Sequence, residues 1–313
     1  MRLTVDTINK SFGEKHVLKD LSFEANGGAF GLLGRNGSGK TTTIRIIMDI
    51  FLPDSGGVLL DGKPFAQYTG RIGYLPEERG LYPKRPIVEQ MAYIGALRGM
   101  KAADARKRGL ALLERLGAEE YYKKKLDTLS KGNQQKIQLA IALINDPELV
   151  ILDEPFSGLD PVNARILKDM VNELVAEGRT VIFSSHQMAN VEEFCNDLCI
   201  INAGETVLSG SLRDIKKSYP RNRIMLVPQD ENMEALRQTS LTHAAVSGLV
   251  ETAEVTAQGC VVTLKRAEDR GVLFHAMAGA GHELDVFRVM EPTLEEIFVE
   301  KCGDAQAEEQ GRA

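Results

Sequence analysis

Two kinds of apolar pattern, strand-like and helical, alternate along the first two thirds of the chain. Short continuous apolar runs, which are typical of strands buried on both faces, occur at 28–33, 150–152 and 180–183. A longer stretch near 164–177 has helical periodicity. Because such strands alternate with helices, we expect an α/β fold with a mainly parallel central sheet. Alternating residues at 3–5 and 17–23 predict an antiparallel β part beside it.

The pattern divides the chain into two domains and a tail. Residues 1–210 hold the first domain, and the helical pattern over about 87–128 predicts a helical insert within it. Over 211–302 the predicted order is strand, helix, strand, strand, helix, strand, which is the order of a small α+β domain of ferredoxin-like type. Residues 303–313 are polar, and we expect them to form a disordered tail.

Composition narrows the functional classes. Of the 313 residues, 43% are hydrophobic and 26% charged, and the formal net charge of −6 argues against general nucleic-acid binding. The longest apolar runs are far shorter than the ~20 residues of a membrane helix, and the N-terminus has no signal-peptide core. The four cysteines form no CxxC pair, which favours idle thiols in a reducing cytosol over a metal site.

A glycine-rich segment follows the first apolar run directly. Residues 34–41 fit G-x-x-x-x-G-K-[ST] between a predicted strand and a predicted helix, the context of a phosphate-binding loop. Backbone N–H groups and the helix N-terminus can hold the phosphates of ATP, Lys40 can neutralise their oxygens, and the Thr41 hydroxyl can ligate Mg²⁺. The predicted nucleotide-binding residues of this segment are Gly34, Arg35, Asn36, Gly37, Ser38, Gly39, Lys40, Thr41 and Thr42.

Two carboxylates end the apolar run at 150–152. Asp153 can hold Mg²⁺ through water and Glu154 can polarise the attacking water, because the carboxyl ends of parallel strands face one crevice. Alone, an Asp-Glu pair is usually the start of a loop. About two dozen residues earlier, Ser130 and Gly132 begin another helix, with Ser130 a candidate N-cap. This second anion-binding end has no phosphate in its own site, which indicates an ATPase completed by a second copy.

The order of these motifs resembles the nucleotide-binding subunits of ABC transporters. The resemblance also rests on Ser157-Gly158-Leu159-Asp160 after the Asp-Glu-Pro, and on His186 after the next predicted strand. It implies that Asp160 contributes to nucleotide binding. It also implies that His186 contacts the γ-phosphate and acts in catalysis beside Glu154 and Lys40.

The same resemblance assigns three further nucleotide contacts. Ser130 and Gly132 are implied to meet the γ-phosphate held by the other protomer. Phe12 matches an aromatic residue that stacks on adenine in this family, although simple packing also explains a phenylalanine there.

Two departures from the family pattern stand out. The usual Leu-Ser-Gly-Gly-Gln is changed at Lys131 and Asn133, and Lys131 either adds charge near the nucleotide or points to solvent. Glu77 replaces the usual glutamine that touches Mg²⁺; a carboxylate can meet the metal but cannot donate a hydrogen bond as an amide can. The segment 75–83 is similar to the sodium-extrusion and drug-resistance branch of ABC exporters (NatA-like).

The resemblance implies an ATP-hydrolysing subunit of an ABC exporter that requires ATP and Mg²⁺. Its expected partners are an integral membrane permease and a second copy of itself or a related ATPase subunit, at the inner face of the cell membrane, with no nucleic acid. Two alternatives stay open: a soluble ABC ATPase that remodels ribosomes or nucleic acid, and a regulator with a decayed ATP site. The transported substrate and the role of the C-terminal domain are open too.

Overall fold

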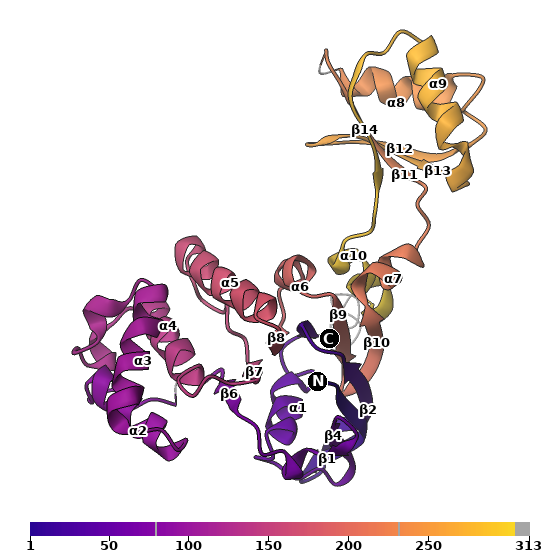
Figure 1. Ribbon diagram of the computed structural model, residues 1–313. Coiled ribbons are helices and arrows are strands. Elements are labelled where there is room, and N and C mark those ends of the chain that lie inside the picture. Colours follow the sequence, from indigo (N-terminus) through magenta and orange to yellow (C-terminus); the bar gives the residue numbers. More distant parts are fainter. Residues whose placement is uncertain (79, 231, 304–313) are drawn as a thin grey trace. The chain divides into compact units, whose positions relative to one another are not determined.

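The computed structural model describes residues 1–78, 80–230 and 232–303, which form two compact units (Figure 1). The first unit comprises Met1–Leu212 together with the chain from Phe298, and the second comprises Arg213–Ile297. The expected boundary at 210 falls close to this division. Residues 298–303 belong to the first compact unit, so the division in the structure falls before the expected end of the accessory domain at 302. The predicted tail over 304–313 lies outside the described residues.

A six-stranded sheet forms the centre of the first unit. Its order is β10-β9-β3-β8-β7-β6, and every neighbouring pair is parallel except β9 and the edge strand β10. The strands span β3 Ala29–Leu33, β6 Ile72–Leu75, β7 Leu149–Leu152, β8 Thr180–Ser185, β9 Asp197–Asn202 and β10 Glu205–Ser211. Strands β3, β7 and β8 are buried along their whole length, which explains their continuous apolar runs. The predicted parallel sheet is confirmed.

An antiparallel sheet of order β2-β1-β4-β5 lies beside it. Its strands are β1 Leu3–Phe12, β2 Lys15–Ala25, β4 Ser55–Leu60 and β5 Lys63–Pro64. One apolar cluster joins residues of β1 and β2 to β3 and to helix α1 (Lys40–Ile47), so the two sheets share a core around α1. The core therefore holds the start of α1, where the phosphate-loop motif ends, on a rigid base.

The predicted insert contains α2 (Ile87–Leu97) and α3 (Ala102–Arg115), followed by short 3₁₀ turns at Glu119–Tyr121 and Leu126–Thr128. Both helices pack on α4 (Lys131–Ala142), which leads through a turn into β7. The remaining helices of the first unit are α5 Pro161–Ala176 and α6 Met188–Phe194, and α7 (Leu212–Lys217) begins at the division between the two units.

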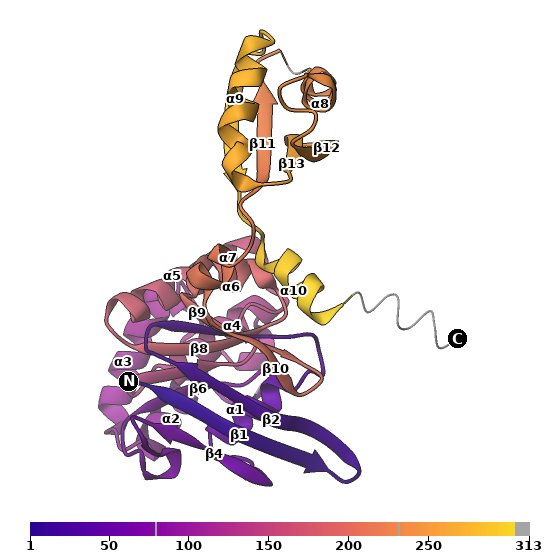
Figure 2. The same ribbon diagram turned by 90° about the vertical axis from the view of Figure 1, so that its right-hand side faces the viewer.

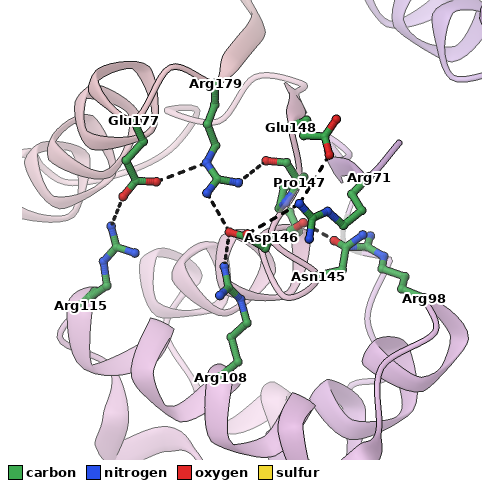
Figure 3. A network of polar contacts seen from close by, with 11 residues as sticks. Arg71, Arg98, Arg108, Arg115, Asn145, Asp146, Pro147, Glu148, Glu177 and Arg179 are labelled. Atoms are coloured by element: carbon green, nitrogen blue, oxygen red, sulfur yellow. Dashed lines mark hydrogen bonds and ion pairs between the residues drawn. The ribbon is translucent and has the colours of Figure 1, made fainter. Parts of the chain in front are cut away.

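Arginines fasten the insert to the turn between α4 and β7 (Figure 3). The Asp146 carboxylate accepts hydrogen bonds from Arg108 of α3 at 2.7 Å and from Arg179, which precedes β8, at 2.8 Å. Arg98, which follows α2, donates to the last carbonyl groups of α4, at Ile141 and Ala142. The N-terminal end of β7 is thus tied to the insert, while Asp153 and Glu154 follow its other end.

The second unit has the predicted order of elements (Figure 2). They are β11 Arg223–Pro228, α8 Met233–Thr242, β12 Val250–Thr256, β13 Gly259–Leu264, α9 Arg270–Gly279 and β14 Leu284–Met290. All strand pairs are antiparallel in the order β12-β13-β11-β14, and residues of α8 and α9 share an apolar core with the sheet. Helix α10 (Leu294–Cys302) follows, with Thr293 and Glu296 forming a capping box at its start.

Candidate nucleotide-binding and active site

The phosphate loop connects β3 to α1, as its motif predicts. Gly37 and Gly39 have φ values of +80° and +113°, which other residues adopt only with strain. A Cβ on Gly34 would lie 2.3 Å from the Ser38 Oγ, so this position also requires glycine. Lys40 begins α1; its buried Nζ donates to the carbonyl oxygens of Gly34 at 2.8 Å and of Arg35 at 3.2 Å. The loop is thus folded around its own lysine.

A cavity of about 430 Å³ opens over this loop. It brings together Phe12, Glu77 and Glu154 with six residues of the predicted loop, and its lining comprises Phe12, Lys15, Val17, Asn36, Gly37, Gly39, Lys40, Thr41, Thr42, Glu77 and Glu154. Phe12 is 44% exposed, and its ring meets that of Phe51 edge to face at 5.5 Å. Lys15 and Val17 were not predicted to line this cavity. The turn at Gly13 is a sequence signal for the β1–β2 hairpin, in which Lys15 pairs with Phe12.

Three oxygen-bearing side chains converge at the carboxyl end of β7. The Thr41 hydroxyl lies 3.3 Å from Asp153 Oδ1 and 3.4 Å from Glu77 Oε2. Burial raises the pKa of Asp153, whereas the hydrogen bond of 2.6 Å that its carboxylate accepts from Ser184 acts to lower it and does not outweigh the burial. Its Oδ2 is buried and has no hydrogen-bond partner among the described residues. An unpartnered carboxylate oxygen next to a hydroxyl and a second carboxylate fits a hard cation such as Mg²⁺.

Glu154 is held in a strained and crowded position. Its φ is +49°, a region that costs a non-glycine residue of order 1–3 kcal/mol and that clusters at functional sites. Oε1 lies 3.3 Å from Lys40 Nζ, and Oε2 lies 2.8 Å from His186 Nδ1. The backbone N–H donates to the Ser184 hydroxyl at 2.8 Å. Ser184 therefore links the Asp153 carboxylate to the backbone of Glu154. Sequence reasoning missed this contact, because only the place of Ser184 at the end of β8 hints at it.

The other predicted nucleotide contacts, Ser130, Gly132 and Asp160, lie at the starts of two helices, away from the cavity over the phosphate loop. Ser130 is the N-cap of α4, as predicted, and its hydroxyl accepts from the Asn133 N–H at 3.4 Å. Asp160 is the N-cap of α5 and accepts from the backbone of Asn163, whose amide group would lie 2.6 Å from a Cβ on Gly132. In the described structure, none of Ser130, Gly132 and Asp160 lines the cavity over the phosphate loop. Lys131 is exposed.

This geometry defines a class of protein. A phosphate loop leads from β3 of the parallel sheet into α1, and two carboxylates follow β7 of the same sheet: Glu154 lines the cavity, and Asp153 lies 3.3 Å from the Thr41 hydroxyl. Such an arrangement is typical of P-loop nucleoside triphosphatases of α/β architecture.

Comparisons with known proteins place the chain within this class. The ABC transporter family matches residues 18–157, and the family "ATP-binding protein DrrA1-3-like, C-terminal domain" matches 210–302. YhaQ of Bacillus subtilis (strain 168), an uncharacterized ABC transporter ATP-binding protein, is 40% identical over 303 residues, covering 96% of this chain and 98% of its own. Nod factor export ATP-binding protein I of Cupriavidus pinatubonensis is 30% identical over 307 residues, covering 96% and 90%.

A bacterial ABC transporter cassette solved as a dimer has the same fold, with a TM-score of 0.62 and 23% identity over 67% of this chain and 99% of that one. The chain therefore belongs to the ATP-binding proteins of ABC transporters and is an ATPase. None of the helices in the described ranges is long and apolar enough to span a membrane.

Proposed function

We propose that this chain is the ATP-hydrolysing subunit of an exporter and acts as a head-to-tail pair on a separate membrane permease. One observation carries the proposal. Ser130 and Gly132 form a helix start suited to phosphate, yet they do not line the cavity that holds the phosphate loop. A second chain turned head to tail supplies the missing phosphate. The related cassette that was solved as a dimer supports this arrangement.

Each site then takes its parts from two chains. In the structure Lys40 is paired with Glu154. When ATP binds, Lys40 turns to the phosphates, and Glu154, released from this pair, accepts a proton from the attacking water. His186 holds the Glu154 carboxylate in place through Nδ1, and the family resemblance assigns it the contact with the γ-phosphate. Thr41, Asp153 and Glu77 are the residues that can hold Mg²⁺, which when bound supplies charge neutralisation at the phosphates.

The insert offers a place for the permease. Tyr93 of α2 and Tyr82, in the loop before α2, are both about half exposed, and their rings meet edge to face at 6.3 Å beside a cavity of about 370 Å³. The Gln90 side chain fixes Tyr82 by bonding to its backbone N–H and carbonyl, each at 2.9 Å. Tyr82 lies five residues after Glu77 (82 − 77), so a partner seated here acts on the loop that carries a candidate metal ligand.

The relatives support a direction of transport and a branch of the family. The match of 210–302 to a DrrA-like C-terminal domain supports the drug-resistance side of the predicted NatA-like branch. A relative named for Nod factor export supports export over import. With a permease as partner, the chain is placed at the inner face of the cell membrane.

Affinity capture tests the proposal. Tagged Glu154→Gln chain, incubated with detergent-solubilised membranes, ATP and Mg²⁺, is expected to recover a protein of several membrane helices, identified by mass spectrometry. Tyr93→Arg should lose that partner, whereas Leu97→Arg, at an exposed apolar position of α2 outside the cavity, should keep it. Recovery of ribosomal or DNA-associated proteins instead would overturn the proposal in favour of a remodelling ATPase.

A further inference from the structure

The last turn of α10 contacts the phosphate loop within the first unit. The Arg35 guanidinium lies 5.7 Å from the centre of the Phe298 ring, and its Nη2 donates a hydrogen bond of 3.1 Å to the carbonyl oxygen of Gly303. Phe298 is only 3% exposed. Gly303 has φ of +71°, the left-handed conformation that ends many helices. A residue of the phosphate loop therefore contacts α10 and the residue after it, which lie more than 260 positions later in the sequence.

Arg35 is also held from its other side. Its backbone carbonyl accepts from Lys40 Nζ at 3.2 Å, while its side chain is held by α10. Lys40 must turn its ammonium group to the phosphates when ATP or ADP enters, because this charge neutralises them. The carbonyl of Arg35 then loses a charged donor. A change in nucleotide occupancy thus reaches Arg35 directly, and Arg35 is the residue that α10 grips.

We propose that the last turn of α10 is a positioning element for the phosphate loop, with Phe298 and the Gly303 carbonyl fixing Arg35. Fixing the side chain limits how far the loop relaxes when Lys40 leaves it, so the docked helix favours the nucleotide-binding shape. The coupling is reciprocal: if nucleotide changes the docking of α10, then docking changes nucleotide affinity by the same factor. Phe298 acts through Arg35 and is not itself a ligand of the nucleotide.

Helix α10 follows the last strand of the second unit in the sequence, although its end contacts the phosphate loop. α10 begins only four residues after β14, the last strand of the second unit (294 − 290). The chain from Phe298 to Gly303 thus belongs to the first unit again and contacts Arg35 of the phosphate loop. A purely apolar anchor would place Phe298 against aliphatic side chains alone. Here its ring also lies against a guanidinium, a cation–π contact that burial strengthens.

Variants of Phe298 in the full chain test the proposal through binding of ADP, which occupies the loop without hydrolysis. Phe298→Leu keeps an apolar side chain but removes the ring, and it should raise the Kd for ADP about two- to five-fold by calorimetry. Phe298→Tyr should restore the wild-type Kd, since tyrosine also binds cations. Val299→Ala, on an outward-facing position of α10, should leave it unchanged. Equal Kd values for the Leu and Tyr variants would overturn the proposal.

Cysteine reactivity provides a second test on the unmodified chain. Cys195, Cys199 and Cys260 are buried, whereas Cys302 is partly exposed on the same turn of α10. Burial raises the pKa of the Cys302 thiol, and the charge of Arg35 opposes this. Saturating ADP should therefore change the rate of Cys302 alkylation by N-ethylmaleimide about twofold or more, followed by mass spectrometry. An alkylation rate that is the same with and without ADP would overturn the coupling, even if the Phe298 variants fail to fold.

Discussion

Replacing Asp146 by asparagine removes the charge at the centre of the arginine network (Figure 3) while keeping the shape of the side chain. Asp146 has φ of +58°, which asparagine tolerates well, so the variant adds little backbone strain. What it loses is one carboxylate that accepts from Arg108 at 2.7 Å and from Arg179 at 2.8 Å. Both arginines then face an amide in place of a negative charge.

The expected loss is small but measurable. The Asp146 side chain is 37% exposed, so its pairs with Arg108 and Arg179 are screened by water and are each worth about 0.2–1 kcal/mol. Because the two short contacts share one carboxylate, we expect Asp146→Asn to lower the free energy of unfolding by about 1–2 kcal/mol. Asp146→Ala should lose about 1 kcal/mol more, since alanine resists a positive φ. Glu148→Gln, which breaks one exposed pair with Arg71, should change stability by less than about 0.5 kcal/mol.

The pKa of Asp146 predicts how the stability difference between wild type and Asp146→Asn changes with pH. Burial raises the pKa of Asp146, but the charges and hydrogen bonds of Arg108 and Arg179 outweigh it and hold the pKa below the ordinary value of 3.8. A carboxylate with a lowered pKa contributes stability above its unfolded pKa and loses it as the pH falls through the folded pKa. In calorimetric unfolding of the full chain, the gap between wild type and Asp146→Asn should be full at pH 7 and close towards pH 3. A gap absent at pH 7 in low salt, or unchanged at pH 3, would refute the reasoning.

Three further predictions concern the nucleotide site. Glu154→Gln should bind ATP but hydrolyse it about 10²–10⁴-fold more slowly; hydrolysis at the wild-type rate would remove Glu154 as the base. Phe12→Ala should weaken ATP binding by about 1–3 kcal/mol, as loss of a stacking platform does, and an unchanged Kd in a titration would mean that Phe12 only packs. In Gly132→Ala the new Cβ meets the Asn163 amide at 2.6 Å, so ATPase activity of the assembled dimer should fall while ADP affinity of the monomer stays constant. A parallel loss of ADP affinity would contradict that assignment.

Local sequence signals located the parts of the site but not all of their contacts. The continuous apolar run at 149–152 and the glycine pattern at 34–41 are local, and strand β7 and the phosphate loop lie where they predict. Ser130 was predicted as an N-cap because capping depends only on neighbouring residues. The contact of Ser184 with Asp153 joins two strands and leaves no local trace.

The C-terminal helix shows the same limit on a larger scale. Helix α10 begins at Leu294, shortly after Pro292, and carries Glu295 and Glu296 in its first turn, which are local signals of a helix start. That its last turn belongs to the first unit could not be predicted, because Phe298 meets Arg35 across more than 260 residues of chain. The positive φ of Glu154 is likewise imposed by packing around β7 and not by a residue type that favours it.

Light scattering of the Glu154→Gln chain with ATP and Mg²⁺ tests the two-chain site most directly. We predict a particle of twice the mass of one chain with ATP, and of one chain with ADP. Adding Ser130→Arg should keep the particle at the mass of one chain, because an arginine at the N-cap of α4 blocks the contact with the other protomer's phosphate, while ATP still binds the monomer. A double variant that dimerises with ATP as readily as Glu154→Gln would contradict the account.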